Sequence, residues 1–147
     1  MFNTMIKLSL LLKEFADQHH LDEPTPNEKS IYHLIIDDME IACFEKLGKG
    51  YFYSELMTLS AQKNTMPTVL KNLMNHSLAR IKSQTCGLGL DADNNLILFE
   101  RFDIDVMNLY DFSDLLERFV NALEEYRHFV VAEPTDHPAT NTMIITP

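Results

Sequence analysis

Hydrophobic residues recur every three to four positions in three segments of the chain, which is the spacing of an amphipathic helix. These segments span residues 4–19, 66–83 and 112–130. The third is the most regular, because its apolar stripe persists for about five turns against a charged opposite side. Asp111 stands where a cap of this helix is expected, and Pro134 is expected to end it.

Five further segments have the composition and length of strands: residues 31–36, 39–47, 51–59, 86–90 and 96–102. Short polar connections join the neighbouring strands: residues 37–38, 48–50 and 91–95. Such connections are typical of hairpins, so the strands should pair antiparallel. The predicted fold class is α+β, with a helix, a three-stranded antiparallel meander, a helix, a two-stranded hairpin and a long C-terminal helix.

The second predicted strand carries apolar side chains on both of its faces. Successive residues of a strand point to opposite sides, so Met39, Ile41 and Cys43 share one face. Ala42 and Phe44 share the other. Helices can cover one face, but the second face also needs cover, which is a first indication of a partner.

Length and composition predict one globular domain. The chain has 147 residues, of which 46% are hydrophobic and 23% are charged, the balance of an ordinary folded protein. We expect this domain to span residues 1–132. Residues 133–147 are mostly polar and contain several prolines, which predicts a flexible tail in which residues 143–145 are candidates for a docked strand.

The net charge is −10, from 22 acidic and 12 basic residues. Phosphate backbones and anionic lipid surfaces repel such a chain, so nucleic acid and membranes are poor candidates as partners. A basic or weakly apolar protein segment is a better candidate, because an acidic surface attracts it and keeps the complex in solution.

The chain carries no sign of export or membrane insertion. Its first residues lack a basic start, a long apolar run and a small-residue cleavage site, and no stretch approaches the ~18 apolar residues of a membrane helix. Cys43 and Cys86 are too few for a disulfide framework. We therefore expect a cytoplasmic protein with reduced thiols.

Residues 91–95 resemble the start of a calcium-binding loop. Asp91, Asp93 and Asn95 have the required spacing, but Leu96 stands where glycine is needed and Phe102 where a bidentate glutamate is needed. A hairpin turn explains the same residues, so we predict no calcium site here.

No catalytic or cofactor site is indicated elsewhere. The six histidines include no i, i+4 pair, no Cys-x-x-Cys occurs, and Gly87-Leu88-Gly89 lacks the lysine and the helix of a phosphate-binding loop. Cys86 with His76 is a conceivable nucleophile and base, yet nothing marks an oxyanion site or an orienting residue. We predict that the protein is not an enzyme, holds no metal and no cofactor, and works by binding another protein.

In order, length and acidity the predicted elements resemble the class I type III secretion chaperones, the family of the Tir chaperone. Four segments carry the resemblance: LLLKEFADQHHL (10–21), YHLIIDDMEIACF (32–44), GLGLDADNNLILFERF (87–102) and FSDLLERFVNALEEY (112–126). It covers residues 5–131. The apolar connection at residues 102–110 departs from the family pattern, in which a simple link is expected.

The resemblance implies a homodimer in the bacterial cytoplasm that binds the N-terminal region of a secreted effector or regulator and keeps it soluble and competent for secretion, without a nucleotide cycle. By position it assigns the dimer interface to six residues of the second helix and the fourth strand: Val69, Leu70, Leu73, Met74, Leu88 and Leu90. It assigns the effector-binding surface to eight residues of the first helix and the meander: Leu12, Phe15, Ile31, Leu34, Ile36, Ile41, Phe44 and Phe52.

Two other functions remain open at this point. Specialised members of the resembled family are freed when their cargo is secreted, then sequester an anti-activator and switch on transcription. An acidic inhibitor that mimics nucleic acid would also explain the charge, but it predicts acidic residues concentrated along one exposed stripe. In this sequence they are spread over turns and helix faces.

Overall fold

The computed structural model describes residues 3–58 and 66–132. Its elements are α1 (Asn3–Gln18), β1 (Tyr32–Ile36), β2 (Met39–Lys46), β3 (Lys49–Thr58), α2 (Met66–Ala79), β4 (Gly87–Leu90), β5 (Asn95–Asp103), η2 (Ile104–Val106) and α3 (Leu109–Ala132). The predicted α+β order is confirmed. The predicted tail, with the strand suggested at residues 143–145, lies outside the described residues. No helix within the described ranges is long and apolar enough to cross a bilayer.

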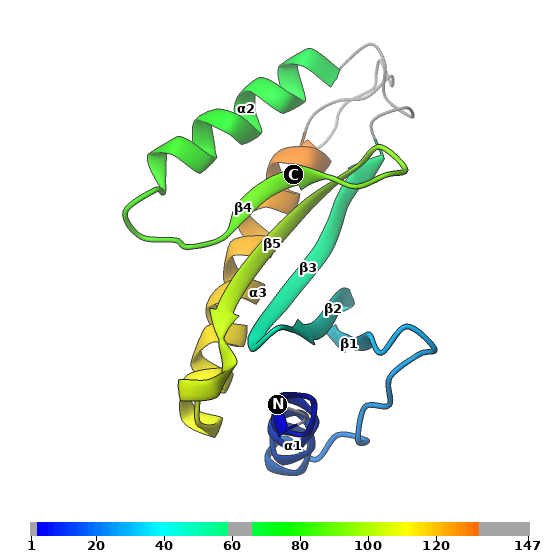
Figure 1. Ribbon diagram of the computed structural model, residues 1–147. Helices are drawn as coiled ribbons and strands as arrows, with labels where there is room; N and C mark the ends of the chain where they lie inside the picture. Colours follow the sequence, from blue (N-terminus) through cyan, green and yellow to red (C-terminus); the bar gives the residue numbers. More distant parts are fainter. Residues whose placement is uncertain (1–2, 59–65, 133–147) are drawn as a thin grey trace.

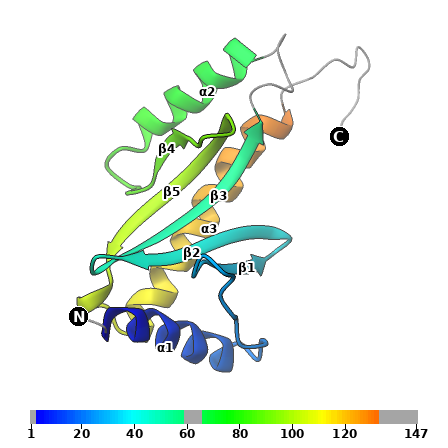
Figure 2. The ribbon, with the colours of Figure 1, turned by 45° about the vertical axis from the view of Figure 1, so that its right-hand side comes forward.

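The five strands form one antiparallel sheet in the order β1-β2-β3-β5-β4. The hairpin of β4 and β5 therefore joins the meander through β5, and β1 and β4 are the two edges. Figures 1 and 2 show α3 running along one face of the sheet, with α1 near one end of α3 and α2 near the other. The opposite face carries no helix from the described part of the chain (Figure 1).

A cluster of phenylalanine rings forms the centre of the core between the sheet and the helices. The Phe52 ring of β3 lies 5.5 Å from that of Phe119 and 5.7 Å from that of Phe112, both on α3. It also lies 4.7 Å from the Phe102 ring of β5. Phe15 of α1 meets Phe112 edge to face at 6.1 Å. Tilted and edge-to-face pairs add to the stabilisation from burial, so one cluster holds α1, α3 and the sheet together.

The hairpin turns of the meander place residues at positive φ. Asp37 and Asp38 join β1 to β2 with φ of 52° and 66°, at the predicted connection. The next turn differs from the prediction, because Leu47 and Gly48, with φ of 54° and 80°, form it and Gly50 lies inside β3. Two-residue turns with positive φ at both positions match the right-handed twist of paired strands, which favours this shorter connection.

The helix α3 begins three residues earlier than the sequence predicts. Asn108 is its cap, since the Asn108 side chain accepts a hydrogen bond from the backbone N–H of Asp111 at 2.8 Å. The Asp111 carboxylate in turn accepts the N–H of Asn108 at 3.5 Å. Asp111, predicted as the cap, is thus the third helical residue of a reciprocal capping box. The apolar connection before it folds as η2, where the buried side chain of Ile104 explains its composition.

Replacing Gly50 by alanine tests the packing of β3 on β5. A Cβ at Gly50 would lie 2.3 Å from Cε2 of the buried Phe102 ring. We expect Gly50→Ala to lower the free energy of unfolding by ~1–3 kcal/mol, because a packed ring must move.

Gly87→Ala is the matched control. Its Cβ would lie 3.2 Å from the Phe99 ring, which is exposed and free to turn away, so we expect a change within ~0.5 kcal/mol. Urea unfolding of both variants gives the comparison, and equal losses would contradict this account of Gly50.

Candidate functional site

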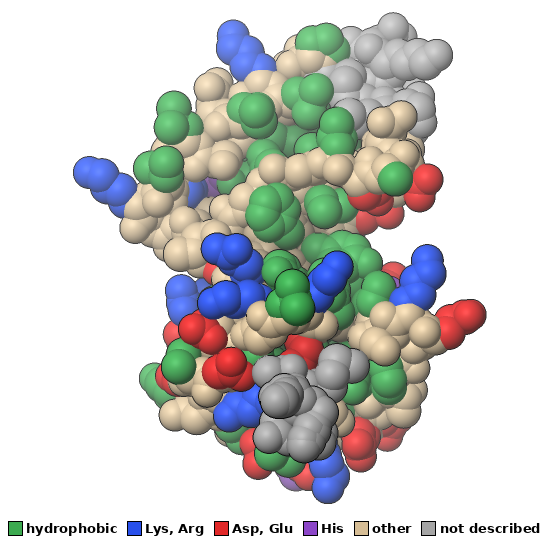
Figure 3. Space-filling view, in the orientation of Figure 1, with side chains coloured by type: hydrophobic (Ala, Val, Ile, Leu, Met, Phe, Trp, Pro, Cys, Tyr) green, Lys and Arg blue, Asp and Glu red, His purple; other side chains and the backbone are tan. Residues whose placement is uncertain are grey.

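The face of the sheet that the helices leave uncovered carries a band of apolar side chains, which we call the open face. It consists of residues that alternate with the core positions of four strands: Ile35, Ala42, Phe44, Tyr51, Tyr53, Ile97 and Phe99. The register places Phe44 opposite Tyr51 and Tyr53 opposite Phe99, so these side chains form rows across the strands. Figure 3 shows hydrophobic side chains gathered on this side of the molecule over β3 and β5.

Three aromatic side chains of the open face contact one another and so form a preordered surface. The rings of Phe44 and Tyr51 stack, with centroids 4.8 Å apart and planes 16° from parallel. Tyr53 meets Phe44 edge to face at 6.0 Å. Phe99 is 40% exposed and Ile35 is 73% exposed. Contiguous exposed apolar patches of this kind mark surfaces that bind a partner.

Two glycines of β4 make room for the Phe99 ring. Gly87 and Gly89 pair with Phe99 and Ile97, and a Cβ at either glycine would lie 3.2 Å from the Phe99 ring. A side chain on this edge strand would therefore press on the ring. The glycines leave the ring lying across β4, which extends the apolar surface toward that edge.

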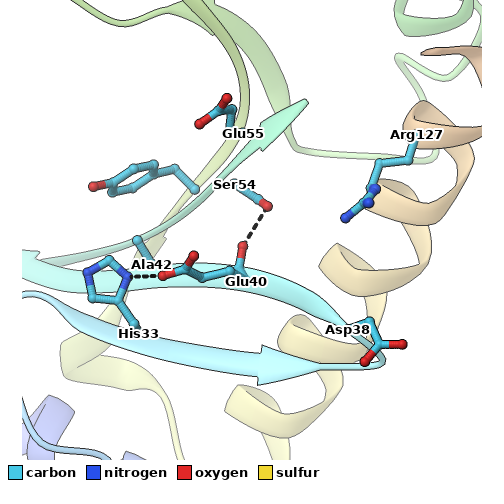
Figure 4. Close-up of a pocket in the computed structure, with 8 residues that line it drawn as sticks. His33, Asp38, Glu40, Ala42, Ser54, Glu55 and Arg127 are labelled. Carbon is cyan, nitrogen blue, oxygen red and sulfur yellow. Dashed lines mark hydrogen bonds and ion pairs between the residues drawn. The ribbon is translucent and has the colours of Figure 1, made fainter. Parts of the chain in front are cut away.

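At one end of the open face the strands β2 and β3 diverge around a cavity of about 360 Å³. The two strands are paired only between the turn and the pair of Ala42 with Tyr53. On the far side of that pair, the Ser54 hydroxyl donates a hydrogen bond to the backbone oxygen of Glu40 at 2.7 Å. Figure 4 shows Asp38, Glu40 and Glu55 around this cavity, with Arg127 reaching toward the strands from α3. His33 Nδ1 lies 2.8 Å from a Glu40 oxygen. We call this feature the acidic hollow.

A second apolar surface lies on α2 and β4, and we call it the α2 patch. Its members are four exposed and two half-buried residues: Met74, Leu78, Ile81, Leu90, Leu70 and Leu88. A cavity of about 300 Å³ is lined by four of them, Met74, Leu78, Ile81 and Leu88, and the buried Tyr126 of α3 forms part of its wall. The helix ends at Ala79, earlier than predicted, so Ile81 lies in the following turn and projects outward.

Glu125 of α3 anchors the element that carries the α2 patch. One of its oxygens lies 3.0 Å from His76 Nε2 and 3.5 Å from Arg80 Nε, and it accepts a hydrogen bond from the Gln84 side chain at 3.2 Å. The His76 ring also packs against Tyr126 at 4.9 Å. Removing the Glu125 carboxylate costs more than one pair, because His76, Arg80 and Gln84 all lose their shared acceptor.

The Cys86 thiol is unsuited to catalysis. Burial, followed by the negative charge of Glu100, raises the pKa of Cys86 to about 11, so the thiol stays protonated at neutral pH. The side chain of His76, which the sequence offered as its base, is paired with Glu125. Burial likewise raises the pKa of Cys43, which lies in the core. Both cysteines are free thiols in structural positions.

Asp91 closes the β4–β5 turn. Its carboxylate accepts the backbone N–H groups of Asp93 and Asn95, each at 2.9 Å, and the Asn95 side-chain amide at 3.1 Å. These hydrogen bonds, first that from the Asn95 backbone, lower the pKa of Asp91. In the described part of the chain no cluster of His, Cys, Asp and Glu could hold a metal ion. The hairpin interpretation of this segment therefore has a direct structural basis.

The structure separates the eight predicted effector-binding residues into two groups. Five are in the hydrophobic core: Leu12, Phe15, Leu34, Ile41 and Phe52. They point toward the helices because they fall on the core side of the strand alternation or of α1. Ile31 and Ile36 are half-buried, and Ile36 packs against the core. Phe44 belongs to the open face.

The six predicted dimer residues divide in the same way. Val69 and Leu73 are buried inside the protomer. Leu70, Met74, Leu88 and Leu90 belong to the α2 patch, where Met74 and Leu90 are exposed. The α2 patch additionally contains Leu78 and Ile81, which the prediction of the interface did not include.

The sequence held a signal for the missed residues of the open face. The alternation noted in the second strand recurs in β3 with Tyr51 and Tyr53, and in β5 with Ile97 and Phe99. Applying the same two-residue period to all strands would have found these residues. Which of the two alternating sets faces the helices was decided by α3, and the strand pattern alone left both options open.

A model of the Tir chaperone protein (CesT) family matches residues 10–127 of the chain. The matched range contains the whole sheet, α2 and most of α1 and α3. No curated protein sequence matches the chain at a significant level.

Several solved structures share the fold. A chain of the ExsC–ExsE complex gives a TM-score of 0.67 at 14% sequence identity, over 90% of this chain and 98% of that one. A chain of the HopA1–SchA chaperone–effector complex gives 0.68 at 12% identity, over 85% and 96%. A chain of the complex between the Yersinia pestis type III secretion chaperone SycH and a fragment of YscM2 gives 0.57 at 20% identity, over 80% and 98%.

The buried carboxylate of Glu100 predicts a pH dependence of stability. Burial raises the pKa of Glu100 above its ordinary value of 4.5, while a hydrogen bond from the Thr85 hydroxyl and the charge of Arg118 oppose the shift. The folded state then binds this proton more tightly than the unfolded state. The stabilisation from this group is complete below pH 4.5, and it is lost as the pH rises through the pKa of Glu100 in the folded state.

We therefore expect Glu100→Gln to gain stability relative to the wild type as the pH rises above 4.5, because the amide has no charge to bury. Chemical unfolding at several pH values measures the difference. Glu117→Gln, at an exposed position of α3, is the control for the loss of one negative charge and should show no such trend. A constant difference across this range would contradict the assignment to Glu100.

Proposed function

Because the chain belongs to the Tir chaperone protein (CesT) family, we propose that it is a type III secretion chaperone that binds the N-terminal region of a secreted effector or regulator through the open face. It keeps this cargo soluble and competent for secretion in the bacterial cytoplasm. The family consists of chaperones rather than enzymes, in agreement with the prediction that the protein is not a catalyst.

The observation that carries the proposal is an ordered aromatic surface without cover from the described chain. Phe44 and Tyr51 stack in place, and Phe99 lies exposed across the glycines of β4. A free protein that exposes such a surface gains stability and solubility when a partner covers it. The HopA1–SchA structure is a chaperone–effector complex with the same fold, which supports a protein partner here.

We propose further that the protein is a homodimer joined through the α2 patch. Met74 is 62% exposed, Leu78 69% and Ile81 68%, all on one element and its following turn. A two-fold axis brings the same patch of both copies together, so an apolar helix surface is complementary to itself. Figure 1 shows α2 beside the β4 edge of the sheet, whereas the open face lies mainly over β2, β3 and β5, so the two surfaces belong to different elements.

The distribution of charge on the open face argues against mimicry of nucleic acid. Acidic side chains stand at one end, around the acidic hollow, while Lys46, Lys49 and Arg101 stand at the other. A mimic of a phosphate backbone needs negative charges spaced along the whole contact surface. The aromatic band between the two ends fits an apolar protein segment instead.

Leu78→Asp tests the dimer. We expect it to convert the purified protein to a monomer at micromolar concentration, because two carboxylates would be buried in a self-complementary apolar interface. Size-exclusion chromatography with light scattering measures the mass. The control is Val106→Asp, which introduces the same charge at a residue that is 75% exposed in η2 and should leave the mass unchanged. A wild-type protein that is already monomeric would refute the dimer but not cargo binding.

Phe99→Asp tests the open face. We expect it to weaken binding of a cargo segment by tenfold or more, since it places a charge in the middle of the apolar band. The N-terminal region of a secreted protein encoded beside this one is co-expressed, and the binding constant is measured by calorimetry. Val106→Asp is again the control, and circular dichroism checks that Phe99→Asp stays folded. Undiminished binding by the folded variant would refute the open face as the cargo site.

A further inference from the structure

A third cavity, of about 220 Å³, is bounded by α3, β5 and the connection from α2 to β4, and we call it the polar cavity. Most of its lining side chains are polar or charged, and none of them belongs to the open face. It shares Arg80, Gln84 and Cys86 with the cavity of the α2 patch. At about 30 Å³ per water molecule, the polar cavity has room for about seven waters or for one small polar group with its linker.

The wall of the polar cavity contains the buried carboxylate of Glu100. On β5 this residue alternates with exposed positions and stands between the core residues Leu98 and Phe102, so its side chain lies on the side of α3 and is only 4% exposed. The Thr85 hydroxyl donates a hydrogen bond to Glu100 Oε2. A buried carboxylate with one neutral donor bears the cost of desolvation without a counter-charge to offset it.

The other charged groups of the polar cavity have partners of their own. Arg80 Nε lies 3.5 Å from a Glu125 oxygen. Arg118 Nε lies 3.1 Å from Asp114 Oδ2. Among the charged residues that line the cavity in the described chain, Glu100 is therefore the one without an ion pair. One negative charge is left for a bound monocation to neutralise.

Gln84 adds a second acceptor without a donor. Its side-chain nitrogen donates to Glu125 at 3.2 Å, whereas its Oε1 atom is buried and accepts no hydrogen bond from the described residues. Leaving a buried acceptor unpaired costs free energy that a suitable donor recovers. Both unfilled positions of the polar cavity thus call for N–H donors, and one of them also calls for a positive charge.

We propose that the polar cavity binds a guanidinium group, which pairs with the Glu100 carboxylate and donates to Gln84 Oε1. A guanidinium combines one positive charge with five N–H donors in a planar fork, so it can serve two acceptors on different elements at once. It is also more weakly hydrated than an ammonium group, which favours its entry into a buried site. The proposal depends neither on cargo binding by the open face nor on the dimer.

N-acetylarginine methylamide tests the proposal with the full-length chain. The matched probe is N-acetylcitrulline methylamide, in which an uncharged urea of nearly the same shape replaces the guanidinium. We expect the arginine probe to bind about tenfold more tightly in an NMR titration at neutral pH, because only this probe supplies the counter-charge for Glu100. The largest shifts should occur at the backbone amides of Thr85 and Glu100 and at the side-chain amide of Gln84.

Methylguanidine distinguishes the two sources of such a group. It carries the guanidinium without the rest of an arginine residue. Equal affinity of methylguanidine and the arginine probe would assign the cavity to a free guanidinium compound. Tighter binding of the arginine probe would assign it to an arginine side chain of a polypeptide. Either result requires the same shifts at Gln84, Thr85 and Glu100.

Glu100→Gln identifies the carboxylate. The amide keeps the shape of the side chain, and urea unfolding checks that the variant is folded. We expect it to lose the tenfold preference for arginine over citrulline. Glu117→Gln removes the same charge from an exposed position of α3 and should preserve the preference, which controls for general attraction of cations to an acidic chain.

Three results would overturn the proposal. The first is equal affinity for the arginine and citrulline probes, and the second is a preference for arginine that survives in Glu100→Gln. The third is a set of shifts centred on Glu40 and Glu55, which would place the cation in the acidic hollow. None of these results bears on cargo binding or on the dimer, which Phe99→Asp and Leu78→Asp test separately.

Discussion

The rest of the structure depends on one constraint: the sheet carries apolar side chains on both faces, but the described helices cover only one of them. The Phe52 cluster fixes α3 and α1 on the core side. Because side chains alternate along each strand, every core residue on β2, β3 and β5 leaves a neighbour on the opposite side. In the middle of the opposite side these neighbours are aromatic, and the contacts of Phe44 with Tyr51 and Tyr53 hold three of the rings in place without a cover. A binding surface is thus a consequence of how the core is built.

The helix α2 is held by a polar network together with a narrow apolar side, whereas an aromatic cluster fixes α3. Glu125 gathers His76, Arg80 and Gln84 around one carboxylate, and Val69 and Leu73 supply the buried side of the helix. One side of α2 therefore packs against the protomer, while the apolar residues on its other side are exposed to solvent. The open face and the α2 patch are therefore produced by different elements of the fold. Contact with a second copy and contact with cargo need not compete.

Residues that suggest chemistry serve the architecture instead. His76 is an ion-pair partner and a ring against Tyr126. Asp91 closes a turn through three hydrogen bonds. The pKa of the Cys86 thiol is raised by its burial, which is opposite to what a nucleophile requires. Polar groups placed in this way order the backbone around the two apolar surfaces, whose shape then decides what is bound.

The sequence by itself determined the order and type of the elements, because helical and two-residue periods of hydrophobicity are local properties. It also indicated a leftover apolar face from the alternation around Ala42 and Phe44. It misplaced the β2–β3 turn and the cap of α3, since the choice between neighbouring turn or cap residues depends on twist and on reciprocal hydrogen bonds. Only the tertiary structure decided which apolar residues are core. Leu34, Ile41 and Phe52 are as hydrophobic as Phe44. The position of α3 nevertheless places these three in the core and leaves Phe44 on the open face. The acidic hollow likewise requires the divergence of β2 and β3 and the approach of Arg127 from α3, a juxtaposition of residues far apart in the sequence that no local pattern encodes.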